Sequence, residues 1–167
     1  GIWLKNKNFN GIKMEKRLKD AITGGAASFS EEINKNNISN DTPKSKLTEI
    51  DNYIIGDIWN RGFCDISHYL SDGKGSTGES LDIDFTLLQL DNAYKRKKDY
   101  DQYIEGLNPN EFSNIKSIWS MLSTETDILY NKIKGKKVVP NDSSYGFDTG
   151  KFSQYMTAFG DAVNEVK

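Results

Sequence analysis

Apolar side chains recur at intervals of three and four residues along most of the chain, which is the spacing of amphipathic helices. The longest apolar stripe lies between about residues 43 and 71. Its members are Leu47, Ile50, Ile54, Ile58, Gly62, Ile66 and Leu70. Pro43 suits the first turn of a helix, because the amide hydrogen that proline lacks would have no intrahelical partner there. The pattern therefore predicts one long helix that forms the backbone of the fold.

Other segments have the same periodicity. They span residues 11–36, 86–104, 108–135 and 148–166. The segment at residues 108–135 has the clearest start: Asn108 can cap the helix, Pro109 suits its first turn, and Glu111 completes a capping box. Each apolar stripe has to be buried against another. The sequence therefore predicts an all-α fold, a single-domain antiparallel bundle of four or five helices over residues 1–167, with residues 1–10 as an N-terminal extension.

A long glycine-rich loop, about residues 71–85, interrupts the helical pattern. Residues 73–78, Gly-Lys-Gly-Ser-Thr-Gly, match the G-x-G-x-x-G pattern of dinucleotide-binding loops. In those proteins the glycines follow a buried strand and open a helix, whereas a long helix precedes them here. The Walker pattern fails as well, because no Gly-Lys-Ser/Thr stands at the required spacing. The loop is therefore predicted to be an interhelical connection, and no cofactor is expected.

The second half of this loop has a different periodicity. Leu81, Ile83 and Phe85 alternate with polar residues, which is typical of a strand, so the loop could carry a short extended segment before a helix that starts at Thr86. Connections of this length are unusual between packed helices. We interpret the loop as a candidate recognition surface, with ordinary core packing as the alternative role of the aromatic members. The candidate binding residues are Trp59, Phe63, Tyr69, Asp72, Glu79, Asp82 and Asp84.

The chain has a single cysteine, Cys64, and a single histidine, His68. An HExxH zinc site and a di-iron carboxylate bundle each need two histidines, and a Cys2His2 zinc site needs two of each residue. The two side chains are four residues apart and can touch on a helix. Two neighbours on one helix rarely form a nucleophile and base oriented by a third group. We therefore interpret them as an incidental pair and predict no catalytic residues.

The acidic residues of the loop leave two further alternatives. A calcium site would use their carboxylates, but the EF-hand spacing fails because Lys74 and Ser76 stand at the third and fifth positions counted from Asp72. A glycosidase-like pair of carboxylates is the other alternative. The favoured prediction is that the protein has no metal site and is not an enzyme.

Charge excludes two classes of partner. The net charge of −2 gives no electrostatic basis for binding nucleic acid or an anionic membrane surface. The basic run at residues 95–98 is flanked by Asp91, Asp99 and Asp101 and is predicted to be a solvated helix face. No apolar run approaches the length of about 20 residues that crosses a bilayer, so we expect no membrane insertion of this segment.

Residues 58–104, from "IWNRGFCDISHYL" to "KKDYDQYI", resemble in style small helical proteins and lipoprotein ectodomains of low-GC Gram-positive bacteria. Because the chain begins at Gly1 rather than Met, we expect that an upstream segment has been removed, either an export signal or a tag. The resemblance implies an extracytoplasmic or cell-surface location, with the cytoplasm as the alternative.

These observations together predict a non-enzymatic helical interaction module that binds a protein or cell-envelope partner. The first alternative is a cytosolic accessory or immunity-type protein that binds a partner through a helix face. The second, less favoured, is an enzyme or a binder of calcium or a small ligand that uses the acidic loop 72–84. The sequence leaves the oligomeric state open.

Overall fold

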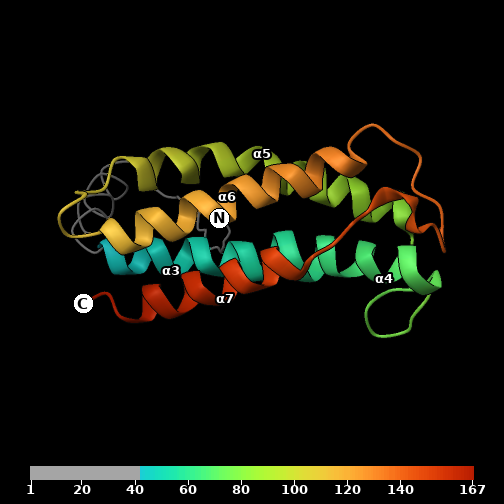
Figure 1. Ribbon diagram of the computed structural model, residues 1–167, viewed down its shortest axis with the longest axis horizontal. Helices are drawn as coiled ribbons and strands as arrows, with labels where there is room; N and C mark the ends of the chain where they lie inside the picture. The colour runs from blue at the N-terminus through green and yellow to red at the C-terminus, as the bar shows by residue number, and fades with distance from the viewer. Residues whose placement is uncertain (1–41) are drawn as a thin grey trace, which may run out of the picture. The chain divides into compact units, whose positions relative to one another are not determined.

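The computed structural model describes residues 42–167, in which four helical rods lie side by side (Figure 1). The first rod joins three consecutive elements, α3 (Pro43–Tyr53), η1 (Ile54–Phe63) and α4 (Cys64–Asp72). The others are α5 (Ile83–Glu105), α6 (Ser113–Ile133) and α7 (Gly150–Asn164), and a short 3₁₀ turn, η2 (Ser143–Tyr145), precedes α7. No strand occurs in this part of the chain, so the predicted all-α class and helical bundle are confirmed.

The compact unit Lys46–Lys167 is described here by itself. The predicted helix at residues 11–36 and the predicted extension at residues 1–10 lie outside the described residues. The prediction of one domain over residues 1–167 therefore stays a prediction. Between residues 42 and 167, no helix combines the length and the apolar character needed to cross a membrane.

Neighbouring rods run antiparallel, because residues early in one rod meet residues late in the other. This is the up-down-up-down order of many four-helix bundles. The pairs that show it are Gly62–Leu90 and Glu49–Tyr100 for α5 on the first rod, Asp91–Tyr130 and Asp101–Trp119 for α6 on α5, and Trp59–Phe152 and Asp51–Gly160 for α7 on the first rod.

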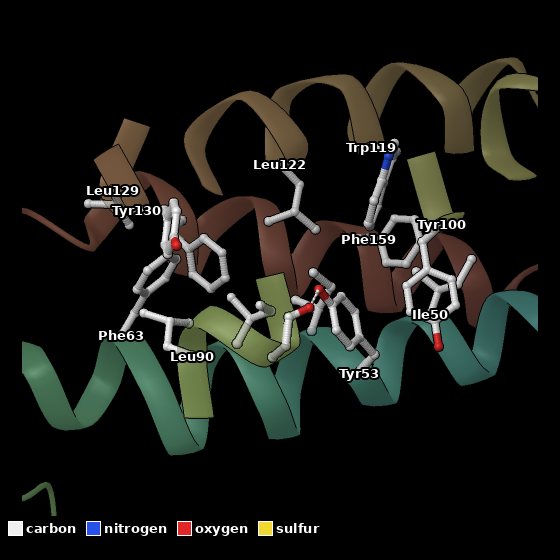
Figure 2. Packing of buried hydrophobic residues seen from close by; sticks show 14 of the residues in the cluster. Ile50, Tyr53, Phe63, Leu90, Tyr100, Trp119, Leu122, Leu129, Tyr130 and Phe159 are labelled. Atoms are coloured by element: carbon white, nitrogen blue, oxygen red, sulfur yellow. Dashed lines mark hydrogen bonds between the residues drawn. The ribbon is translucent and has the colours of Figure 1, made fainter. Parts of the chain in front are cut away.

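The core of the bundle lies between the four rods, and large side chains from all of them meet there (Figure 2). Three phenylalanines, Phe63, Phe152 and Phe159, are fully buried. Phe63 meets Phe152 edge-on at 5.2 Å between ring centroids, and Phe159 lies 5.2 Å from the ring of Trp119. These aromatic contacts join the first rod, α6 and α7 into one core.

The middle of the first rod is wound as a π-helix, in which the N–H of Cys64 bonds to the carbonyl of Trp59, five residues back. The buried stripe from Ile50 to Leu70 explains this winding, because its members follow one another at steps of four residues. An α-helix overshoots a full turn by about 40° at each such step, which would rotate the stripe by about 200° along its length.

A π-helical turn holds more than four residues, so each four-residue step falls short of a full turn. The α-helical and π-helical stretches of the rod therefore rotate the stripe in opposite senses. As a result the stripe stays on one face: Ile54, Ile58 and Ile66 are all fully buried, and Leu70 is 6% exposed. The sequence predicted the helix over these residues but not its π-winding, although the four-residue step is the signal for it.

In the structure, α5 starts closer to the N-terminus than the sequence predicts. The helix begins at Ile83, and the side chain of Asp82 caps it by accepting a hydrogen bond from the N–H of Phe85 at 3.1 Å. The prediction of an extended segment here and of a helix start at Thr86 is therefore wrong. Thr86 is buried in the first turn, where its hydroxyl donates to the carbonyl of Asp82. The cap formed by Asp82, one turn before Thr86, favours a helix here over the strand that the alternation of apolar and polar residues indicates.

The predicted start of α6 at Asn108 is also wrong. Asn108 closes a turn, in which its side-chain oxygen accepts from the N–H of Asn110 at 2.8 Å and its carbonyl accepts from the N–H of Phe112 at 2.9 Å. The helix itself begins at Ser113. Lys116 then reaches back and donates to three carbonyls at the end of α5, those of Ile104, Glu105 and Leu107.

One carboxylate in the bundle has an incomplete set of partners. Asp51 of α3 faces α7 at Gly160, where an added Cβ would lie 3.4 Å from both of its carboxylate oxygens. Its Oδ1 is buried and has no hydrogen-bond partner among the described residues. Burial raises the pKa of Asp51, and the negative charge of Asp161 raises it further.

We expect Asp51→Asn to stabilise the protein at neutral pH. A carboxyl group whose pKa is raised by folding contributes stability below its unfolded pKa of about 3.9, and this stability is lost as the pH rises through the folded pKa. Because Asp51 is only half-buried, solvent screening limits the gain at pH 7 to a few tenths up to about 1 kcal/mol. Urea unfolding between pH 3 and pH 7 measures it.

The difference between Asp51→Asn and the unchanged protein should vanish near pH 3 and grow as the pH rises. Asp161→Asn is the control, since it removes a nearby charge from an exposed side chain and should have a smaller effect. Parallel stability profiles for Asp51→Asn and the unchanged protein would show that the buried charge carries no penalty.

Candidate functional site

The structure places the three predicted aromatic residues on the first rod, in or against the core. Phe63 is fully buried and Trp59 is partly buried, with its ring stacked on Phe152 at 5.7 Å. Tyr69 is partly buried, and its carbonyl accepts from the N–H groups of Gly73 and Asn141. These aromatic side chains therefore pack in or against the core of the bundle, and the recognition surface beside the loop stays a prediction.

The four predicted acidic residues are exposed, and each lies at a different place in the loop or at the adjoining helix ends. Asp72 accepts from the N–H of Lys74 at 3.0 Å, and Asp82 caps α5. Glu79 accepts from both the N–H and the hydroxyl of Thr77, and these hydrogen bonds lower its pKa. Asp84 lies in the first turn of α5. Within residues 42–167, no three potential metal-ligating side chains gather.

The loop's backbone N–H groups are occupied by the protein's own acceptors, so they do not form an open cradle for a phosphate. Five consecutive amides, from Lys74 to Gly78, each donate a hydrogen bond. The acceptors are, in order, the side chain of Asp72, the carbonyl of Glu79, the side chain of Asp65, the side chain of Glu79 and the carbonyl of Gly75. A phosphate would have to displace these partners before it could bind.

Cys64 and His68 do not have the features of an activated pair. His68 is exposed, and Cys64 is partly buried. Burial raises the pKa of the Cys64 thiol, which makes the reactive thiolate scarcer at neutral pH. This shift is opposite to the one that activates a nucleophilic cysteine.

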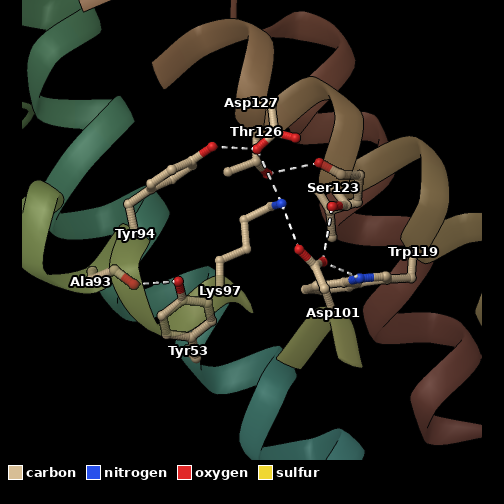
Figure 3. Close-up of polar contacts among 10 residues, drawn as sticks. Tyr53, Ala93, Tyr94, Lys97, Asp101, Trp119, Ser123, Thr126 and Asp127 are labelled. Carbon is tan, nitrogen blue, oxygen red and sulfur yellow. Dashed lines mark hydrogen bonds and ion pairs between the residues drawn. The ribbon is translucent and has the colours of Figure 1, made fainter. Parts of the chain in front are cut away.

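A buried lysine connects α5 to α6 (Figure 3). The side chain of Lys97 is 6% exposed, and its Nζ lies 2.9 Å from Oδ2 of Asp101 and 3.1 Å from Oδ1 of Asp127. Asp101 also accepts from Nε1 of Trp119 at 2.8 Å and from the hydroxyl of Ser123 at 3.0 Å. The prediction that residues 95–98 are a solvated face is therefore wrong at Lys97, which points into the interface between the two helices.

Tyrosines complete this network on the side toward the start of α5. Tyr94 donates to Asp127 at 2.5 Å, Tyr130 donates to Asp91 at 2.6 Å, and the two rings stack 3.8 Å apart. Burial raises the pKa of Tyr130 to about 12, and the hydrogen bond to Asp91 contributes to the shift. The three carboxylates of this network therefore serve to hold α5 against α6.

A second polar cluster lies at the surface between η1 and α5. It lines a groove of about 210 Å³, which we call the η1–α5 groove and whose residues are Asp57, Arg61, Gln89, Asn92, Ala93 and Arg96. Asp57 binds two guanidinium groups, with its Oδ1 2.9 Å from Nη1 of Arg61 and its Oδ2 2.6 Å from Nη2 of Arg96. The guanidinium of Arg96 also lies over the ring of Tyr53, 4.9 Å from its centroid.

Exposed apolar side chains stand next to this groove on the same helix. Phe85 is 55% exposed and Leu88 is 57% exposed. Residues 85, 88, 92 and 96 follow one another at three- and four-residue steps, so they share one face of α5. Exposed apolar groups beside exposed arginines are a combination that protein interfaces use.

Sequence reasoning did not identify this groove. The spacing of Asp57 and Arg61 is compatible with an ion pair on one helix turn, which was a usable signal. Arg96 belongs to the run predicted to be a solvated helix face, and its contact with Asp57 spans 39 positions of the chain. Only the packing of α5 against η1 brings the second arginine to the same carboxylate.

Two larger hollows lie elsewhere on the described residues. One, of about 440 Å³, lies between the start of α6 and the end of α7 and includes Phe112 and Val166. The other, of about 570 Å³, lies between α4 and the segment before α7 and includes Leu70 and Phe147. Neither has two cationic side chains that share one carboxylate, which distinguishes the η1–α5 groove from both.

No protein-family model, curated protein or solved structure matches this chain. No residue role therefore comes to it from a relative. Its function has to be inferred from its own surfaces, among which the η1–α5 groove combines paired arginines with exposed apolar neighbours.

Proposed function

We propose that this chain is a non-enzymatic interaction module that binds a protein partner through the η1–α5 groove and the exposed apolar side chains beside it. The observation that carries the proposal is the sharing of one carboxylate, Asp57, by Arg61 and Arg96 at the surface. The two arginine side chains remain 68% and 50% exposed, so they are accessible to a partner. Phe85 and Leu88 add apolar surface that a partner would remove from water.

The winding of the first rod supports this role. The four-residue step that keeps the apolar stripe inside also aligns Asp57, Arg61 and Asp65 along one flank of the rod, about a quarter turn from the stripe. Asp65 holds the loop by accepting from the N–H of Ser76 at 2.9 Å. Asp57 and Arg61, which belong to the groove, and Asp65, which holds the loop, therefore lie along one side of a rod whose apolar stripe is fixed in the core.

The location of the protein is part of the same proposal. We place it as the soluble part of an exported or surface-attached protein of a Gram-positive bacterium, on the resemblance of residues 58–104 alone. The alternative is a cytosolic accessory or immunity-type protein with the same groove. The gene upstream of the codon for Gly1 separates them: an export signal with a lipobox cysteine supports the first, and a start codon directly before Ile2 removes it.

A photo-crosslinking residue placed at Asn92 tests the binding role in the cells that make the protein. Asn92 lines the groove, so irradiation should join the chain to one partner protein, which mass spectrometry identifies. The matched control is the same residue at Thr157, which is exposed on α7. A partner captured at Asn92 should then bind the purified protein in calorimetry. Equal capture at both positions, or no capture at Asn92, would overturn the proposal.

A further inference from the structure

The η1–α5 groove has an excess of positive charge and of hydrogen-bond donors. One carboxylate and two guanidinium groups leave one net positive charge among the ionised side chains of the groove. A guanidinium carries five N–H donors, whereas Asp57 receives one ion-pair contact from each arginine. Arg96 also hydrogen-bonds to Tyr100, and the N–H groups of the two guanidiniums beyond these contacts can hold an incoming anion.

The shape of the groove limits that anion to a small group. Its volume is about 210 Å³, and its lining includes the small side chain of Ala93 and the exposed amide side chains of Gln89 and Asn92. A carboxylate is planar and pairs with arginine through two parallel hydrogen bonds. A single carboxylate also matches the one net positive charge, whereas a dianionic phosphate would exceed it.

The neighbouring apolar side chains show that the occupant is more than a free anion. Phe85 and Leu88 lie on the same face of α5 as Arg96, eleven and eight residues before it. At 1.5 Å per residue, these separations are about 16 Å and about 12 Å along the helix. A ligand that uses both features must therefore carry an acidic group and an apolar group about 12 to 16 Å apart.

We propose that the partner of this groove, on the function proposed above, presents an acidic amphipathic segment to it. One Asp or Glu side chain of that segment enters between Arg61 and Arg96, and apolar side chains of the same segment cover Phe85 and Leu88. In a helical segment the acidic and apolar residues are eight to eleven positions apart. Asp57 competes with the incoming carboxylate for the same two arginines, so its charge weakens the binding.

Selection from a displayed library of helical 18-residue peptides tests this occupant with the purified protein. The selected peptides should be enriched in Asp or Glu eight to eleven positions from Leu, Phe, Met or Trp. Replacing that acid by Gln or Asn in a synthetic copy should weaken binding at least about 10-fold, and 0.5 M salt should weaken it as well, because it screens surface charges. Inorganic phosphate at 10 mM should not displace the peptide.

Variants of the groove separate this role from a structural one. Arg96→Gln and Arg61→Gln should each weaken binding of the selected peptide about 10-fold, whereas Asp57→Asn should strengthen it about 3-fold or more, because it removes the competing carboxylate. Lys151→Gln, an exposed lysine on α7, is the charge-matched control and should leave binding unchanged. Circular dichroism of each variant checks that the fold is retained.

The results distinguish the occupant from the binding role itself. Three results would overturn the proposal that the occupant is an acidic segment. They are selected peptides without an acid, no selected peptide at all, and equal binding to Arg61→Gln, Arg96→Gln and the unchanged protein. The binding role would still stand if the partner captured at Asn92 were found. Weaker binding to Asp57→Asn would show that this aspartate contacts the ligand, and displacement by phosphate would show an anion site without a peptide; either result overturns the proposal.

Discussion

Trp119→Ala will lower the free energy of unfolding by about 3 to 5 kcal/mol, the range of large-to-small changes at buried aromatic positions. Trp119 of α6 is 4% exposed, and its ring lies 5.2 Å from that of Phe159 on α7. The change leaves a cavity between the two helices. It also removes the indole N–H that donates a hydrogen bond to Asp101. Urea or guanidinium unfolding followed by circular dichroism measures the loss.

Two further variants separate the causes. Trp119→Phe keeps most of the ring but removes the indole N–H, and should cost about 1 to 2 kcal/mol. Ile128→Ala, on the exposed side of the same helix, should change stability by less than about 0.5 kcal/mol, because this side chain is 45% exposed. A loss below 1 kcal/mol for Trp119→Ala would show that α6 and α7 do not pack as described.

Asp101→Ala is expected to have the second largest effect, a loss of about 2 to 3 kcal/mol. Its removal leaves Lys97 with Asp127 as its remaining ion-pair partner and takes the acceptor from both Trp119 and Ser123. Breaking a fully buried pair by removing one partner costs about 3 to 5 kcal/mol. The carboxylate of Asp101 is 34% exposed, so we place the loss below that range. Denaturant unfolding at pH 7 measures it.

The matched variant is Lys97→Met, which removes the charge but keeps an unbranched apolar side chain. It should cost less than about 1.5 kcal/mol, because methionine packs well in irregular gaps and both carboxylates keep other donors. The double variant should lose less than the sum of the single losses. If Lys97→Met were as damaging as Asp101→Ala, the lysine charge itself would be a net source of stability.

Much of the fold could be predicted from periodicity alone. The long apolar stripe predicted the first rod, and Gly106 and Gly135 marked the ends of α5 and α6 well because glycine suits helix termini. The starts were harder, since several residues in a row can cap. At α5 the side chain of Asp82 forms the cap four residues before the predicted start, and at α6 the residue before Ser113 is Phe112, which forms no side-chain cap and gives no signal in the sequence.

The candidate groove could be predicted only in part. The Asp57–Arg61 pair lies within one helix, so its spacing was visible in the sequence. Arg96 joins it only because α5 packs on η1, where Gly62 lets Leu90 come so close that an added Cβ would lie 2.9 Å from its Cδ1. The glycine loop drew attention through its motif, yet its amides are already bonded within the protein.

The π-helical winding of η1 also limits how this protein can change over evolutionary time. Exchanges of side chains on its outer face leave the alignment of α3 and α4 intact. With the π-winding kept, loss or gain of a single codon there would turn α4 by about 80° about the rod axis, which would take Ile66 and Leu70 out of the core and separate Asp65 from the loop. Variation at η1 should therefore proceed by substitution, whereas insertions and deletions are better tolerated in the loop that follows α4.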